Sequence, residues 1–251
     1  MKRLFGQTLF ALAVGVGSIL VSSACVENDS SIFVRNVQAP PQNRQNGACL
    51  YTPDPTQPFL SEGVLDVAIT PTYTGRLLVG NQLSPRGDQL NVRAESNRVH
   101  LNGAVVRVTG AGGASIGEFT SVTSGFVDPG ANNQPSFGIA GLTLLDAATT
   151  AAINVQGADS RLVIANVKVF GQTLGGVDVE SGEFQFPIRV CNGCLIDFSR
   201  GDDPANPGLD CNLVIDTQSG GTTQFPCIPG QDEVTPCQLC AAVSSACRGQ
   251  Q

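Results

Sequence analysis

The stretch RVHLNGAVVRV (residues 98–108) carries the clearest structural signal in the chain. It places an Asn-Gly pair between two apolar runs, a combination that favours a two-residue turn whose twist matches paired strands. The sequence therefore predicts a β-hairpin centred on Asn102-Gly103. Because side chains alternate along a strand, one face of this hairpin is expected in the core and the other in solvent. The expected core face holds Val99, Leu101, Ala104 and Val106, and the outer face holds Arg98, His100, Val105 and Arg107.

The flanking regions repeat the strand pattern. Between residues 62 and 190, runs rich in Val, Ile, Leu and Phe alternate with clusters of Gly, Pro, Asn and Asp. Only Leu145 to Ile153 has the composition of a short helix. Many short strands without alternating helices predict an all-β fold, a two-sheet sandwich that in outline resembles an immunoglobulin or fibronectin type III domain. The runs are Val64–Ile69, Leu77–Val79, Arg98–Val108, Phe137–Leu145, Arg161–Phe170 and Glu183–Val190.

The chain begins like an exported protein. Lys2 and Arg3 precede an uncharged apolar run, and small residues follow it, which is the pattern of a secretory signal peptide over residues 1–24. Ser22-Ser-Ala-Cys25 resembles the lipobox of bacterial lipoproteins, although Ser22 stands where leucine is usual. The resemblance implies that Cys25 becomes the first mature residue and carries the acyl chains. An ordinary signal peptidase site, which gives a soluble periplasmic or secreted protein, is the alternative.

Charge and composition exclude several classes of partner. Cleavage after residue 24 leaves 12 basic residues against 21 acidic ones, a net charge of −9. Such a chain has no electrostatic route to the phosphates of nucleic acid, and anionic lipid would repel it. Membrane attachment is therefore expected through the N-terminal lipid alone. The absence of Trp also argues against a sugar-stacking platform.

Two segments flank the predicted sandwich. Residues 25–61 are rich in Pro, Gln and Asn, and this favours a tether that includes a possible first strand at Ile32–Val37. Residues 191–251 have few long apolar runs and seven of the nine cysteines, so they are expected to form a disulfide-rich, mostly irregular module. The seven are Cys191, Cys194, Cys211, Cys227, Cys237, Cys240 and Cys247.

Cysteine parity makes a further prediction. In an oxidising compartment the eight cysteines other than Cys25 are expected to pair, so Cys49 must reach one of the seven C-terminal cysteines. Cys191-Asn-Gly-Cys194 and Cys237-Gln-Leu-Cys240 are both CxxC motifs. Structural disulfides are the expected reading of these motifs, and a metal site or a redox pair is the alternative.

No catalytic constellation is visible in the sequence. His100 is the only histidine, and the predicted hairpin places it on the outer face. A surface residue is the plain interpretation; a small anion-binding patch of Arg98, His100 and Arg107 is the sharper one. Gly110–Ser115 lacks the following helix that a phosphate loop needs, and Asp197, Asp202, Asp203 and Asp210 lack calcium-loop spacing.

Taken together, these features predict a non-enzymatic lipoprotein of the bacterial cell envelope, expected at the outer membrane, with a structural or binding role and no cofactor or bound metal. An envelope protein is the expected partner beside the membrane. The alternative from another class is an envelope redox or metal-binding protein that uses the two CxxC pairs.

Overall fold

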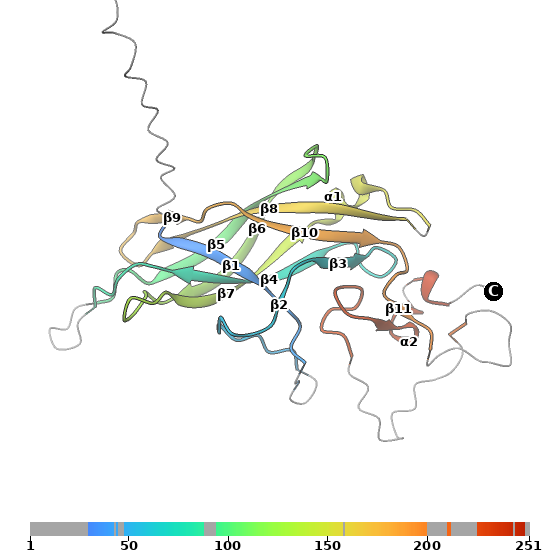
Figure 1. Cartoon of the computed structure of the whole chain (residues 1–251), viewed down its shortest axis with the longest axis horizontal. Helices are drawn as coiled ribbons and strands as arrows, with labels where there is room; N and C mark the ends of the chain where they lie inside the picture. The colour runs from blue at the N-terminus through green and yellow to red at the C-terminus, as the bar shows by residue number, and fades with distance from the viewer. Residues whose placement is uncertain are drawn as a thin grey trace, which may run out of the picture.

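The computed structural model describes residues 30–42, 44, 48–87, 94–157, 159–199, 210–211, 225–242 and 244–248. Two main sheets face each other across one apolar core, and a cysteine-rich C-terminal region lies at one end of them (Figure 1). The predicted all-β architecture with a cysteine-rich C-terminal region is thus confirmed. Within the described residues, no helix has the length and apolar character needed to cross a membrane.

The first sheet has the strand order β2-β1-β4-β7. Strand β1 (Ile32–Gln38) pairs antiparallel with β4 (Tyr73–Asn81), which in turn pairs antiparallel with β7 (Ser136–Leu145), and β2 (Phe59–Leu60) forms the short outer edge. The segment expected to be a tether therefore contributes two strands to the sandwich. This places the start of the folded sandwich at Ile32, only seven residues after Cys25.

The second sheet has the order β3-β10-β8-β5-β6. Its strands are β3 (Gly63–Asp66), β5 (Val99–Gly110), β6 (Ser115–Val127), β8 (Ser160–Thr173) and β10 (Phe184–Cys191), and the short β9 (Asp178–Glu180) pairs with β8. Helix α1 (Ala147–Ile153) forms where a helix was predicted. The Asp146 carboxylate caps it by accepting a hydrogen bond from the Thr149 amide at 2.8 Å.

The predicted hairpin at Asn102-Gly103 is wrong. Strand β5 runs straight through this pair and is hydrogen-bonded to β6 on one side and β8 on the other. Both registers shift between Leu101 and Gly103. Asn102 is the extra residue of a β-bulge against β8, whereas against β6 the extra residue lies on β6, between Val122 and Gly125. Gly103 is needed for close approach rather than for a turn, because a Cβ there would lie 2.5 Å from the Ser121 carbonyl oxygen.

The predicted core face of β5 is nevertheless correct. Val99, Leu101, Ala104 and Val106 are fully buried, whereas His100 is half-buried and Arg107 is exposed. A two-residue turn and a bulge both place Leu101 and Ala104 on the same face, although the two residues are three positions apart. The predicted turn was therefore wrong, but the predicted buried face was right. The chain actually turns after Gly110, whose amide donates to the Ala114 carbonyl at 2.8 Å, with Gly113 at φ 81°.

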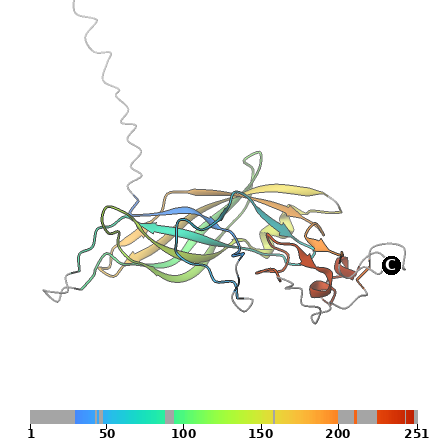
Figure 2. The same ribbon diagram turned by 60° about the horizontal axis from the view of Figure 1, so that its bottom comes forward.

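The C-terminal region lies beyond the end of β10, and the residues of it that the structure describes form only short elements. The strands β11 (Ile196–Asp197) and β12 (Thr235–Pro236) pair in parallel, and α2 (Cys237–Cys240) and the 3-10 turn η2 (Ala246–Arg248) follow. Figure 2, like Figure 1, places this region at the end of the sandwich opposite the start of β1. We call residues 191–248 the C-terminal module.

Candidate functional site

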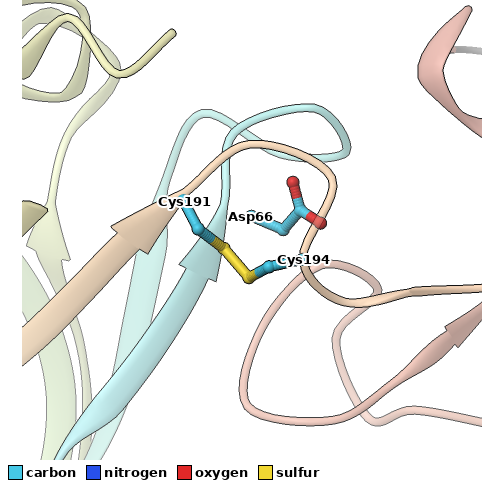
Figure 3. Close-up of side chains that lie close together, drawn as sticks. All are labelled: Asp66, Cys191 and Cys194. Atoms are coloured by element: carbon cyan, nitrogen blue, oxygen red, sulfur yellow. A yellow bond between two sulfur atoms is a disulfide. The ribbon is translucent and has the colours of Figure 1, made fainter. Parts of the chain in front are cut away.

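The junction between the sandwich and the C-terminal module gathers the chemically distinctive side chains. Parallel pairing of β3 with β10 sets Asp66 beside Cys191 at the ends of these strands. The Asp66 carboxylate and the sulfurs of Cys191 and Cys194 all lie within 4.8 Å of one another (Figure 3). Cys191 is 3% exposed, whereas Cys194 is exposed.

This cluster is engaged in internal bonds. Cys191 and Cys194 form a disulfide, and a disulfide sulfur is not the thiolate that metals and redox partners require. The buried Asp66 carboxylate accepts hydrogen bonds from the amides of Gly193 at 2.6 Å, Leu195 at 2.8 Å and Ala68 at 3.0 Å. Asp66 therefore holds the loop after β10 in place, and the cluster offers no open ligand set in its oxidised form.

The two cysteines of the second CxxC motif are not bonded to each other. Cys237 is bonded to Cys211 and Cys240 to Cys247, and both Cys237 and Cys240 are buried. A redox or metal role that uses Cys237 with Cys240 is thus inconsistent with this connectivity. Of the two motifs, only Cys191–Cys194 has the bonding of a redox pair.

Cys49 is bonded to Cys227, across a sequence separation of 178 residues. This is the long-range link that parity requires. It fixes the segment before β2 to the C-terminal module, with a Cα–Cα distance of 5.7 Å. Cys25 lies outside the described residues, as do Asp202 and Asp203 of the acidic stretch.

A half-buried acid, Asp232, and the buried Tyr73 also join the module to the sandwich. The Tyr73 hydroxyl donates to the Asp232 carboxylate at 2.9 Å, and the Val64 amide donates to it at 2.8 Å. Burial raises the pKa of Asp232 above its usual value, against the lowering effect of these hydrogen bonds. Burial, reinforced by the Asp232 charge, also raises the pKa of Tyr73 well above its usual value.

Two further contacts surround this pair. The Gln231 side chain accepts a hydrogen bond from the Thr74 amide at 2.9 Å and donates one to the Thr74 carbonyl at 2.7 Å. The module is thereby hydrogen-bonded to the backbone of β4. The nearly buried side chain of Arg44 forms an ion pair with Glu233, whose other oxygen accepts from the Cys227 amide at 2.8 Å. No local pattern in the sequence distinguishes these residues, because their partners lie more than 150 positions away.

The proposed anion patch of Arg98, His100 and Arg107 does not form, because the hairpin that would bring its members together is absent. Arg98 pairs with Asp128 at 3.0 Å and lies over the Phe126 ring at 4.7 Å. Arg107 pairs with Glu183 at 2.7 Å. His100 packs against Phe126 with 4.8 Å between ring centroids. Each of the two arginines therefore already has a carboxylate of the chain beside it.

Comparison with known proteins leaves the family open. No protein-family model and no curated protein matches the chain. A solved structure, the solution structure of a "putative late embryogenesis abundant (LEA) protein", aligns with 52% of this chain and 71% of its own length, at 11% sequence identity and a TM-score of 0.26. A similarity this low carries no argument.

Proposed function

We propose that this protein is a bacterial cell-envelope lipoprotein, anchored through Cys25, whose β-sandwich holds a disulfide-clasped module as a non-catalytic structural or binding platform. The observation that carries the proposal is the cysteine pairing. All eight other cysteines are bonded to each other, so no cysteine of the chain is left to pair with Cys25. Four disulfides are typical of proteins of oxidising, extracytoplasmic compartments.

The shape of the molecule supports a platform role. The first residue of β8, Ser160, pairs with the last residue of β10, Cys191. Strand β8 then runs for 14 residues to Thr173. At about 3.3 Å per residue this strand spans roughly 43 Å. The C-terminal module is thereby presented at the end of the sandwich away from the anchored segment, where an envelope partner has access to it.

The anchor is tested by mass spectrometry and fractionation. The native protein is expected to begin at Cys25 with an acylated N-terminus, and Cys25→Ala is expected to move the protein from the membrane to the soluble fraction. The matched control, Cys240→Ala with Cys247→Ala, removes two cysteines but keeps Cys25, and should stay with the membrane. An unmodified Cys25 or a retained leader contradicts the proposal.

A second candidate, a redox function at Cys191–Cys194, is favoured by one observation: the two cysteines of this CxxC are bonded to each other and Cys194 is exposed. The location of Asp66 opposes it, because a buried carboxylate disfavours the thiolates that reduction would create beside it. Counting thiols in the folded protein after mild dithiol treatment separates the two functions. The platform predicts none, and the redox function predicts two, both lost in a Cys191→Ala/Cys194→Ala variant.

A further inference from the structure

The turn between β8 and β9, Leu174-Gly175-Gly176-Val177, has two exposed apolar side chains. Leu174 is 56% exposed and Val177 is 62% exposed. No charged residue interrupts the four. Isolated surface apolar residues need no explanation, so the case for a function depends on the backbone and on the location of the turn.

Every amide of this turn already has a partner within the protein. Leu174 and Gly175 donate to the carbonyls of Arg98 and Ser96, each at 2.9 Å. Gly176 donates to the Thr173 carbonyl at 2.9 Å, and Val177 donates to the Thr173 hydroxyl at 3.1 Å. Backbone that enters a membrane must have its polar groups satisfied internally, and the amides of this turn meet that requirement. Its contacts to residues 96–98 also hold it in one conformation.

The turn lies at the end of the molecule where the anchored segment enters the fold. Ile32, the first residue of β1, forms a parallel bridge with Ser181, and Ser30 accepts a hydrogen bond from the Gly182 amide at 3.3 Å. Strand β9 runs parallel to β1, so the residues before Ser181 extend in the same direction as the residues before Ile32. Val177 is four residues before Ser181 and therefore lies roughly 13 Å beyond it, at the rise of an extended strand. Figure 1 shows the start of β1 beside β9, at the end opposite the C-terminal module.

The length of the segment before β1 then limits how far the membrane can be. Ser30 is five positions after Cys25, a span of about 18 Å at full extension. An acyl chain on Cys25 therefore keeps this end of the sandwich within reach of the lipid surface. The predicted long tether does not separate them, because the sandwich begins at Ile32.

We infer that the β8–β9 turn is a second membrane contact, in which Leu174 and Val177 enter the boundary between headgroups and acyl chains while Cys25 supplies the attachment. This inference rests on the proposed lipid anchor. Its occupant is zwitterionic lipid rather than anionic lipid, because Asp178 follows the turn directly and the mature chain is acidic. The contact orients the sandwich, so that the C-terminal module points away from the bilayer.

The chain has no tryptophan, so a single introduced one reports its own surroundings. We would prepare the acylated full-length protein as Leu174→Trp and, as matched control, as Val234→Trp, a residue 62% exposed in the C-terminal module. Both are reconstituted into phosphatidylcholine vesicles, with and without bromine on the acyl chains. The expected result is blue-shifted emission and strong bromolipid quenching for the tryptophan at 174, and neither for the one at 234.

The outcomes separate the two proposals. If the protein is vesicle-bound but neither tryptophan is quenched, the second contact is refuted and the anchor stands. Strong quenching at both positions refutes the orientation. If the native protein is not acylated, or if Cys25→Ala binds membranes as well as the wild type, the proposed function itself fails. Circular dichroism of each variant checks that the fold is retained.

Discussion

At the scale of single residues, Asp232 combines an unusual backbone conformation with a raised pKa. It is half-buried at the contact between the C-terminal module and the sandwich, it adopts φ 60°, and it accepts hydrogen bonds from Tyr73 and Val64. Such backbone is rare for residues other than glycine and suits Asp and Asn best. Its raised pKa means that the folded protein holds the proton more tightly than the unfolded chain does.

This predicts a specific pH dependence for Asp232→Asn. In the wild type, the unfolded chain loses this proton near pH 3.8 and the folded protein only at higher pH, so ionisation of Asp232 costs stability as the pH rises through that window. The slope is at most about 1.4 kcal/mol per pH unit. Asn keeps the shape and the acceptor oxygen but does not titrate. Denaturant melts at a series of pH values should therefore show the free energy of unfolding of Asp232→Asn increasing relative to that of the wild type as the pH rises.

Asp54→Asn is the control of opposite sign. Hydrogen bonds from the Thr56 amide and hydroxyl lower the pKa of the exposed Asp54, so its ionised form stabilises the fold and that contribution disappears as the pH falls. The free energy of unfolding of Asp54→Asn should therefore decrease relative to that of the wild type as the pH rises. If both variants change in the same direction, the assignment for Asp232 is wrong.

At the scale of elements, β5 shows how neighbouring strands override a local turn signal. Asn-Gly favours a hairpin, but β6 and β8 hydrogen-bond β5 along nearly its whole length. The continuous strand gains two ladders, whereas a hairpin there would gain one, would leave β6 without a partner and would leave one edge of β8 unpaired. The Asn-Gly pair is accommodated instead as a bulge with a close contact at Gly103.

Gly103→Ala tests this account of β5. Its Cβ would lie 2.5 Å from the Ser121 carbonyl oxygen, so the strands must move apart, and we expect a loss of about 1–3 kcal/mol in the free energy of unfolding. The control is Gly125→Ala in β6, whose Cβ would meet the Ile139 carbonyl oxygen at an ordinary 3.5 Å and should change stability by under about 1 kcal/mol. Equal effects in urea melts would contradict the close approach at Gly103.

At the scale of the whole molecule, the two ends of the sandwich have different tasks. At one end the chain enters β1 beside the apolar β8–β9 turn, and the other end carries the C-terminal module. Cys49–Cys227, Arg44–Glu233 and Tyr73–Asp232 join the segment before β2, the sandwich and the module at that second end. The module therefore depends on contacts with the rest of the chain for its position.

Removing the long-range disulfide should show this dependence. In the chain-entropy model, closing the 178-residue loop between Cys49 and Cys227 stabilises the fold by about 5 kcal/mol. The 7-residue loop between Cys240 and Cys247 is worth about 2 kcal/mol in the same model. The double Ala variant at Cys49 and Cys227 should accordingly melt well below the one at Cys240 and Cys247. It should also release the module to limited proteolysis, and a reversed order would refute the clasp.

The sequence by itself determined what depends on local pattern and counting: an all-β chain, the buried face of β5, helix α1 and the need for Cys49 to reach the C-terminal cysteines. Side-chain alternation along a strand and an even count of cysteines do not depend on which strands are neighbours. The predictions drawn from them are therefore correct even though the predicted turn is wrong. Only the tertiary structure decided the continuous β5, the disulfide connectivity and the meeting of Tyr73 with Asp232 across 159 positions. These follow from long-range pairing and burial, whose energies outweigh a two-residue turn preference and leave no local trace in the chain.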